Sequence, residues 1–176
     1  MPVPQALHLF LSIFKIMCAV HNKGIVHRDI KLDNYMIGKD GTLVMIDFGF
    51  AAPSQGHLND GFFHGDQLGT ENYKAPEIIY GQYYQGCPVD IFAMGVLLFE
   101  LVFSHDPFVA ACNQDKYFQM IVYNRSDLFW GKHLASIPKS QSSQISDSLK
   151  SLIISMLQYM PNHRPSASEV LGHPCF

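Results

Sequence analysis

Hydrophobic residues near the start of the chain recur with the spacing of a helix. Leu7, Leu11 and Phe14 stand three or four positions apart, so they share one helical face. Gly24 follows the apolar stretch, and a glycine just beyond the last turn is a common way for a helix to end. The pattern therefore predicts a helix over residues 6–20.

The next hydrophobic segments are short and predict strands. Residues 35–37 and 42–46 flank Gly38-Lys39-Asp40-Gly41, a turn sequence typical of a small hairpin. From 51 to 69 the chain is polar, rich in glycine and without periodicity. A segment of this length is more than a simple connector, so we interpret it as a functional loop.

The second half of the chain carries helical patterns. Residues 91–103 are apolar on every side apart from Glu100, and the run is too short to span a bilayer, so it predicts a buried core helix. Pro165 and Ser166 are suited to begin and cap a last helix. Further helices are expected near 113–123, 145–158 and 166–172. The predicted fold class is mostly α, a helical body with a small β-hairpin and one long loop at one end.

Composition limits the classes of protein that fit. With 176 residues, 48% of them hydrophobic, the chain can bury the core of one domain and is not a disordered protein. Charged residues make up 15%, against about 25% in typical soluble domains, so we expect part of the surface to be apolar. The formal net charge of −3 provides no basic field for a nucleic acid or an anionic membrane, and we expect neither as a partner.

The cysteines and histidines show no metal or disulfide pattern. The four cysteines form no Cys-x-x-Cys pair, and the nine histidines lack zinc-type spacing. A reducing, intracellular setting is therefore expected, and within it the cytoplasm. The apolar stretch at the start is interrupted by Lys15, follows no basic residues and precedes no credible cleavage site, so we do not interpret it as a signal peptide.

An ordered series of short motifs surrounds the predicted hairpin. Before the hairpin stands His27-Arg28-Asp29-Ile30-Lys31-Leu32-Asp33-Asn34, and after it Asp47-Phe48-Gly49. Further along follow Gly69-Thr70, Ala75-Pro76-Glu77, residues 90–95 and His163-Arg164-Pro165. Each motif alone is weak, but in this order and spacing they resemble the protein kinase family. The resemblance covers nearly the whole chain.

The resemblance implies a phosphoryl-transfer site that uses ATP and Mg²⁺. It makes Asp29 the group that accepts or orients the proton of the substrate hydroxyl, and Lys31 the cation that neutralises the γ-phosphate. Asn34 and Asp47 would supply oxygen ligands to magnesium. Met36 matches the position on which the adenine ring rests, although a core methionine is almost as good an interpretation. A lysine two residues after the catalytic aspartate implies a serine/threonine kinase rather than a tyrosine kinase.

Other motif residues have structural roles by the same resemblance. His27 and Phe48 belong to a hydrophobic column anchored by Asp90. Glu77 and Arg164 are expected to form a buried ion pair that ties the loop to the last helices. The remaining histidines, including His57 and His64, are expected to face solvent.

Three acidic or hydroxyl residues are candidates for binding the protein substrate. Asp33 and Glu100 match positions where some kinases hold an Arg or Lys upstream of the acceptor Ser or Thr. A Glu at the end of an apolar helix has the alternative of pairing within the protein. Thr70 is expected to help hold Asp29 and Lys31.

The long loop matches the activation segment of the family. In many kinases, the arginine that matches Arg28 is paired by a phosphate on a Ser or Thr. That phosphorylated residue stands four positions before the threonine that matches Thr70, and here the position is Asp66. A carboxylate at this position can pair with Arg28 without modification. We therefore expect an activation segment that is ordered without phosphorylation, the alternative being that Asp66 is only a solvated acid of the loop.

The family's first lobe is not recognisable in this sequence. The 26 residues before His27 include no glycine-rich loop, strand lysine or helix glutamate, so residues 1–176 are expected to be the C-terminal lobe alone, a partial catalytic domain. An apolar exposed surface is then expected where the first lobe would sit. Two interpretations remain: a serine/threonine kinase fragment that is inactive without its first lobe, or a non-catalytic, kinase-like binding module. The intact Asp29, Lys31, Asn34 and Asp47 favour the first.

Overall fold

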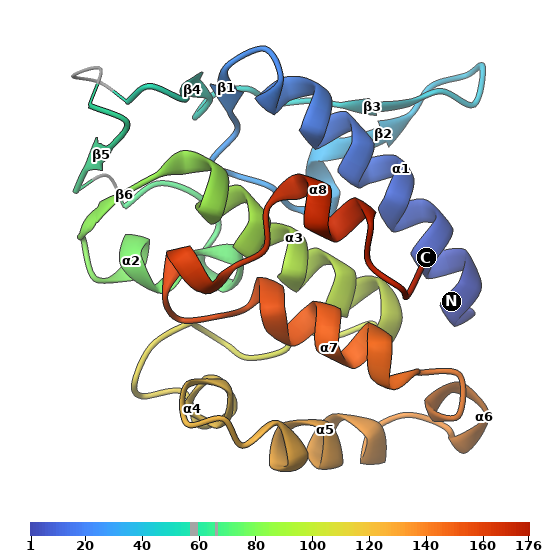
Figure 1. The fold of residues 1–176 in the computed structure, drawn as a ribbon. Coiled ribbons are helices and arrows are strands. Elements are labelled where there is room, and N and C mark those ends of the chain that lie inside the picture. Colours follow the sequence, from blue (N-terminus) through green and yellow to red (C-terminus); the bar gives the residue numbers. More distant parts are fainter. Residues whose placement is uncertain (57–59, 66) are drawn as a thin grey trace.

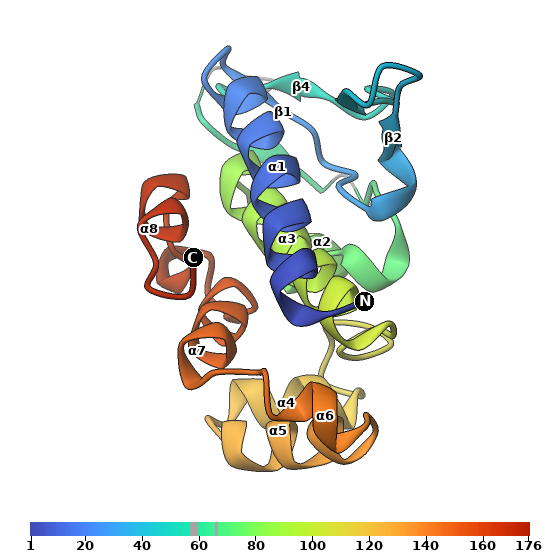
Figure 2. The same ribbon diagram turned by 90° about the vertical axis from the view of Figure 1, so that its right-hand side faces the viewer.

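The computed structural model describes residues 1–56, 60–65 and 67–176 (Figure 1). Three long helices form its centre, because α1 (Val3–His21) and α7 (Asp147–Met156) both pack against α3 (Gly86–Phe103). Seen from the side, strands lie at one end of α3 and the helices α4 (Lys116–Val122), α5 (Ser126–Ala135) and α6 (Lys139–Ser142) lie at the other (Figure 2). The predicted mostly α fold is confirmed.

Helix α3 is the core of the molecule. Almost all of its residues are buried, as its uninterrupted apolar sequence predicts. It begins at Gly86, five residues before the predicted start, because Pro88 lies in the first turn, where a missing backbone N–H costs little. At Gly95 a Cβ atom would lie 2.9 Å from the Cβ atom of Met156. The glycine therefore allows α7 to approach α3 closely.

Two helices are apolar and long enough to cross a membrane by length and composition alone, α1 and α3. In α3 this apolar stretch is 83% buried inside the molecule, as in the core helix of a folded domain.

Among the described residues, the strands are short and form three antiparallel pairs. The predicted hairpin is confirmed, with β2 (Tyr35–Ile37) against β3 (Leu43–Met45) and Tyr35 opposite Met45. In the segment interpreted as a functional loop, β4 (Ala52–Pro53) pairs with β1 (Ile25–Val26), and β5 (Phe63–His64) pairs with β6 (Tyr83–Tyr84). Strands of two residues are too short to produce a period, which is why the sequence did not predict them.

Short helices complete the chain. The predicted last helix is α8 (Ala167–Leu171), and Ser166 caps it with Glu169 in a capping box. Helix α2 (Pro76–Ile79) and three 3₁₀ turns connect the longer elements. The turns are η1 (Leu32–Asn34), η2 (Glu71–Tyr73) and η3 (Pro161–His163).

The expectation that the other histidines face solvent is wrong for His133 and His21. His133 is 5% exposed and packs in α5 against Phe129, with ring centroids 4.4 Å apart. Burial, together with the nearby His105, lowers the pKa of His133 to about 4, so the ring is neutral and packs as an aromatic residue. His21 is mostly buried beside Asp90, and His64 is half-buried against Tyr83. His57 lies outside the described residues.

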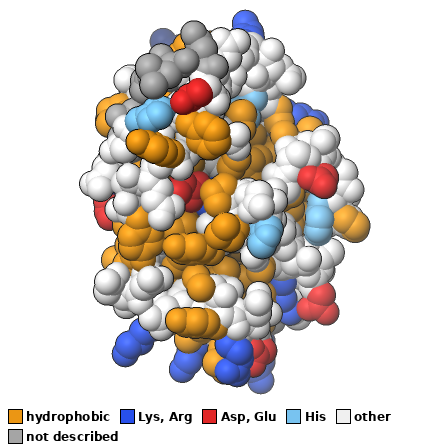
Figure 3. Space-filling view, turned by 60° about the vertical axis from the view of Figure 1, so that its left-hand side comes forward, with side chains coloured by type: hydrophobic (Ala, Val, Ile, Leu, Met, Phe, Trp, Pro, Cys, Tyr) orange, Lys and Arg blue, Asp and Glu red, His pale blue; other side chains and the backbone are white. Residues whose placement is uncertain are grey.

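The surface is apolar over a large area, as the low content of charged residues predicted. On the face shown in Figure 3, hydrophobic side chains gather over a broad central area, and Lys and Arg lie mainly towards the lower edge. Several exposed hydrophobic residues belong to the hairpin and to the motif after it. They are Met36, Ile37, Val44, Phe48 and Phe50.

Candidate active site

A buried aspartate binds the backbone at the start of the motif that spans residues 27–34. Asp90, in the first turns of α3, accepts hydrogen bonds from the backbone N–H groups of His27 and Arg28, each at 2.8 Å. Arg28 has a φ of 65°, a conformation that costs about 1–3 kcal/mol in residues other than glycine. The two hydrogen bonds offset this cost and fix the direction in which the next residue, Asp29, leaves the backbone.

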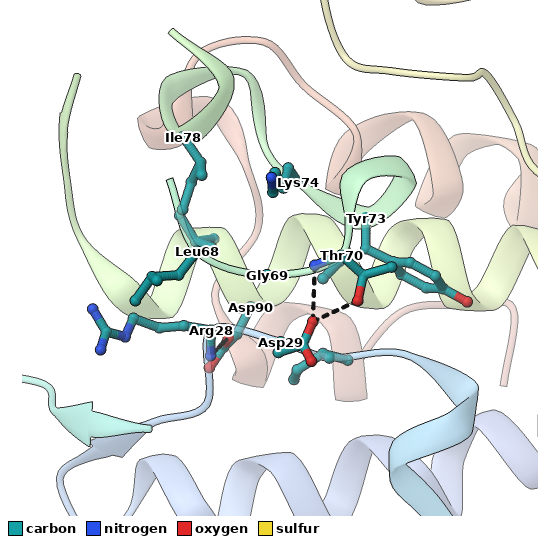
Figure 4. A pocket seen from close by; sticks show the side chains of 12 residues that line it. Arg28, Asp29, Leu68, Gly69, Thr70, Tyr73, Lys74, Ile78 and Asp90 are labelled. Carbon is teal, nitrogen blue, oxygen red and sulfur yellow. Dashed lines mark hydrogen bonds between the residues drawn. The ribbon is translucent and has the colours of Figure 1, made fainter. Parts of the chain in front are cut away.

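The Asp29 carboxylate is held by three side chains from two motifs. Its Oδ1 accepts hydrogen bonds from the backbone N–H of Thr70 at 2.9 Å and from the Thr70 hydroxyl at 2.8 Å (Figure 4). Its Oδ2 lies 3.2 Å from Nζ of Lys31 and 3.3 Å from Nδ2 of Asn34. Nζ of Lys31 also donates to the Thr70 hydroxyl at 2.9 Å. Residues 41 positions apart in sequence thus meet at one carboxylate.

These contacts determine the charge of Asp29. Burial raises the pKa of the carboxyl, but hydrogen bonds from Thr70, Lys31 and Asn34 and the charge of Lys31 outweigh it and hold the pKa below its ordinary value. Asp29 is therefore an anion at neutral pH. Such a carboxylate can orient a hydroxyl and accept its proton late in the reaction, when the oxygen has begun to bond to phosphorus.

Gly69 makes the approach of Thr70 possible. Its φ is 98°, and a Cβ atom at this position would lie 2.8 Å from the carbonyl oxygen of Arg28. The hollow beneath these residues measures only about 10 Å³ and is lined by Arg28, Asp29, Thr70 and Asp90 among others (Figure 4). The site is thus tightly packed on the side of α3.

Asn34 and Asp47, the magnesium ligands that the resemblance implies, each have a side-chain oxygen that can act as a ligand. Asn34 is buried and donates through Nδ2 to the carbonyl oxygen of Asp29 at 2.7 Å, so its amide oxygen remains an acceptor. Asp47 is exposed, with a φ of 59°, and its Oδ1 accepts the N–H of Gly49 at 3.1 Å. No group of three or more His, Cys, Asp or Glu among the described residues could hold a metal. Magnesium commonly takes one or two protein ligands and completes its shell with phosphate oxygens and water.

Met36 lies on the open side of the hairpin. It is 56% exposed, so the alternative that it is a core methionine is wrong. His27 is buried and its ring centroid lies 5.1 Å from that of Phe48, which is the predicted packing contact. Phe48 itself remains 46% exposed.

The Arg28 side chain points away from Asp29 towards the long loop (Figure 4). Its guanidinium carbon lies 4.5 Å from the centre of the Phe63 ring, a cation–π contact. Its Nε donates to the carbonyl oxygen of Phe50 at 2.7 Å, and its Nη1 donates to the Tyr84 hydroxyl at 3.3 Å. Asp66, its predicted partner, lies outside the described residues.

The predicted ion pair between Glu77 and Arg164 is present. Nη1 and Nη2 of Arg164 donate to the two carboxylate oxygens of Glu77 at 2.6 and 2.7 Å. Both side chains are almost fully buried, and the guanidinium also lies over the Phe92 ring at 4.9 Å. Residues 75–77, which follow the long loop, are therefore tied to the segment before α8.

Glu100 lies in an acidic group that sequence reasoning identified only in part. Burial raises its pKa, and the negative charges of Asp106 and Asp33 raise it further, whereas a hydrogen bond from the Tyr73 hydroxyl opposes the rise. Asp33 and Glu100 were candidates from the sequence, but Asp106 was not. The sequence could not relate Asp106 to Glu100 by helical spacing, because α3 ends between them at Phe103 and Ser104 has a left-handed φ of 60°.

Known proteins resemble this chain over almost its full length. A sequence model of the family described as Protein kinase domain matches residues 2–176. The chain belongs to the protein kinase family. Sperm motility kinase 2B of Mus musculus is 34% identical over 170 residues, which cover 97% of this chain and 31% of the relative.

Two further kinases match the same region. Maternal embryonic leucine zipper kinase of Xenopus tropicalis is 34% identical over 97% of this chain and 24% of its own length. The PAS domain-containing serine/threonine-protein kinase of Mus musculus is 29% identical over 97% of this chain and 11% of its own length. The chain thus spans less than a third of the length of these relatives.

Proposed function

We propose that this kinase chain is the C-terminal lobe of a serine/threonine protein kinase, which transfers the γ-phosphate of ATP to Ser and Thr hydroxyls of protein substrates. The observation that carries the proposal is the network of Asp29, Lys31 and Thr70. An ionised carboxylate for the hydroxyl and an ammonium group for the phosphate lie 3.2 Å apart. Phosphoryl transfer depends on such positioned charges more than on covalent chemistry.

Each residue of the site has one task in this proposal. Asp29 orients the acceptor hydroxyl and takes its proton, and Thr70 keeps the carboxylate directed at the acceptor. Lys31 binds the transferred phosphate. Asn34 and Asp47 would hold magnesium, which neutralises charge on the phosphates.

The exposed hydrophobic residues of the hairpin support a second lobe as the partner that completes the ATP site. Met36 and Ile37 are 56% and 70% exposed, and soluble proteins rarely leave adjoining apolar side chains uncovered without a partner. We therefore propose that residues 1–176 alone transfer phosphate poorly, because half of the nucleotide clamp is supplied from elsewhere. The free cysteines support the intracellular, cytoplasmic setting that belongs to this proposal.

A chimera tests the proposed activity. The first lobe of maternal embryonic leucine zipper kinase is joined to residues 1–176, and phosphate transfer from ATP to a peptide library is measured with and without the added lobe. We expect transfer to Ser and Thr by the chimera alone, and its loss in Asp29→Ala. A folded chimera that binds peptides without phosphorylating them would instead support the binding-module alternative.

We also propose that the substrates carry Arg or Lys upstream of the acceptor. The negative charges of Asp33 and Asp106 both raise the pKa of Glu100, so three carboxyl groups lie near one another. The Tyr73 hydroxyl donates to Oε2 of Glu100, so the internal pairing weighed as an alternative does occur. The second carboxylate oxygen of Glu100, Oε1, can still accept a hydrogen bond from a guanidinium group. Peptide arrays on the chimera should therefore lose their preference for upstream Arg in Asp33→Asn with Glu100→Gln, and an unchanged preference would contradict the assignment.

The contacts of Arg28 support regulation without phosphorylation of the activation segment. Its guanidinium already contacts Phe63, Phe50 and Tyr84. These contacts join β5 and β6 to the catalytic loop, which is the task that a phosphate performs in other kinases. We propose that the segment is ordered in the unmodified protein, with Asp66 as a further partner of Arg28.

A further inference from the structure

A pocket separate from the Asp29 site opens beyond the end of α3, beside α4 and α5 (Figure 2). Residues 105–109, which follow α3, line it together with Tyr117 of α4 and with Lys132, His133 and Ser136 at the end of α5. Its volume is about 220 Å³, below the range of about 300–1,000 Å³ found for small-molecule sites. A space of this size suits one large side chain of a bound protein better than a whole small molecule.

Aromatic rings form the wall of this pocket. The His105 ring stacks on the His133 ring, with centroids 5.3 Å apart and 25° between the planes. Tyr117, which is 40% exposed, packs on the same imidazole with centroids 5.0 Å apart. Phe99 and Phe129 lie against the His133 ring at 4.7 and 4.4 Å. Such a wall favours another aromatic ring, because paired rings gain more than the burial of their area alone.

One buried nitrogen of this wall lacks a partner. His133 is 5% exposed, and its Nε2 has no hydrogen-bond partner within the part of the chain that the structure describes. The neighbouring His105 differs, because its Nδ1 lies 2.9 Å from the carbonyl oxygen of Asp106 and its Nε2 lies 3.2 Å from the Ser136 hydroxyl. Leaving a buried polar atom unpaired is costly, so an unpaired nitrogen in the wall of a pocket indicates a polar group on the ligand.

The charge of His133 narrows the chemistry of that group. Because its pKa is about 4, the imidazole is neutral at pH 7, and Nε2 either donates or accepts according to the tautomer. A hydroxyl can donate and accept, so it suits both tautomers, whereas an indole N–H can only donate. A tyrosine side chain combines a flat ring with such a hydroxyl.

Asp106 connects the pocket to the acidic group proposed to bind the substrate. Asp106 lines the pocket, its Oδ1 accepts a hydrogen bond from Nδ2 of Asn72 at 3.0 Å, and its charge raises the pKa of Glu100. Asn72 follows two residues after Thr70, which binds the Asp29 carboxylate. A peptide whose basic residues reach the acidic group therefore lies near the mouth of the pocket.

We propose that this pocket binds a tyrosine side chain of the protein substrate, upstream of the acceptor. The inference rests on the proposed function, because it takes Asp106 as part of the substrate-binding surface. The tyrosine ring packs against His105 and Tyr117, and its hydroxyl pairs with Nε2 of His133 once the exposed Tyr117 ring has moved aside. Lys132 also lines the pocket, so the basic residues of the substrate belong on the Asp106 side only.

Peptide binding to the unaltered chain tests the proposal. Fluorescent peptides carry Arg upstream of a Ser, and Tyr, Phe or Ala is placed in turn at each position further upstream. Affinity is measured by fluorescence anisotropy, and the contacted ring is located by NMR of a chain with labelled histidines. At one position we expect Tyr to bind about three- to tenfold more tightly than Phe, with a shift of the His133 ring signals. Equal affinity of the Tyr and Phe peptides at every position would overturn the proposal.

A variant tests the role of the unpaired nitrogen. His133→Phe removes the nitrogen and keeps a ring in its place, so the Tyr and Phe peptides should bind this variant about equally well. A preference for Tyr that survives in folded His133→Phe would overturn the assignment. If circular dichroism shows that the variant is unfolded, the comparison of the Tyr and Phe peptides on the unaltered chain decides.

A second pair of variants tests the connection to the substrate acids. Asp106→Asn removes the charge and keeps an oxygen for Asn72, and it should weaken binding of the peptide with Arg and Tyr about threefold or more. Asp127→Asn is the matched control, because Asp127 is a surface acid of α5 with a side chain 66% exposed. Equal affinity of the two variants would contradict a shared surface.

These measurements are independent of phosphate transfer. A two-lobed chimera that phosphorylates peptides without any preference for Tyr would refute this inference and leave the proposed function standing. A chain that binds the Tyr peptide through His133, joined to a first lobe without gaining activity, would refute the proposed function and leave the tyrosine pocket standing.

Discussion

Replacing Arg164 with alanine should destabilise the fold strongly. The substitution leaves the Glu77 carboxylate, 3% exposed, without its bidentate partner. It also deprives the carbonyl oxygens of Gln158, Pro88 and Tyr159 of donors. Removing one partner of a buried pair typically costs about 3–5 kcal/mol, because an uncompensated charge stays buried.

The effect can be measured by urea and thermal unfolding. A domain of this size loses about 2–4 °C in melting temperature per kcal/mol, so Arg164→Ala should lower it by roughly 6–20 °C. The chain offers a matched control in Arg125, which pairs with Asp127 at 3.2 Å on the surface, where the two side chains are 54% and 66% exposed. Arg125→Ala removes the same side chain and should leave the melting temperature almost unchanged.

A double-mutant cycle separates the pair from the rest of the arginine's contacts. If Glu77→Gln is combined with Arg164→Ala, the loss should be smaller than the sum of the two single losses, because no charge is then left unpaired. If Arg164→Ala destabilises no more than Arg125→Ala does, the argument that this pair fastens the activation segment to the last helices is refuted.

Three further outcomes are expected. His133 has a pKa of about 4 in the fold against 6.5 for the ordinary group, so between these pH values the unfolded chain binds a proton that the folded chain does not. The contribution of the neutral ring to stability is therefore full above pH 6.5 and falls as the pH is lowered towards 4. His133→Phe should reduce this fall in acid unfolding curves. Gly69→Ala should unfold at lower urea than Gly61→Ala, since both have positive φ but only the former puts a Cβ atom 2.8 Å from the Arg28 carbonyl oxygen; equal midpoints would count against the close approach. Turnover of the two-lobed chimera should survive phosphatase treatment and fall in Asp66→Asn, and activity that disappears with phosphatase would exclude regulation without phosphorylation.

Local sequence patterns determined which elements could be predicted. The central helix is an uninterrupted apolar run and the hairpin is two short apolar segments around a glycine-containing turn, and both elements are confirmed. Helix α5 was not predicted, because its buried face consists of Phe129, Trp130 and His133, and histidine counts as polar in a hydrophobic pattern. Its burial as a neutral ring depends on neighbours that only the folded chain brings together.

The candidate site also has a part that the sequence predicts and a part that it does not. Asp29, Lys31, Asn34 and Thr70 belong to recognisable motifs, and the structure brings these four together at one carboxylate. Apart from those that Asp90 makes with the catalytic loop, the contacts that position the motifs are long-range and carry no motif of their own. The partners of Arg28 in β5 and β6, and His21 beneath the catalytic loop, are examples, since each contact joins segments with unrelated local patterns.

Helix α3 explains why one apolar segment matters to several parts of the site. Asp90 near its start holds the catalytic loop, and Glu100 near its end lies among the carboxylates proposed to bind the substrate. Ten residues of helix place these groups about 15 Å apart along the axis, and burial on nearly all sides keeps the helix from shifting within its packed surroundings. The distance between the point of chemistry and the point of substrate recognition is therefore set by the core itself.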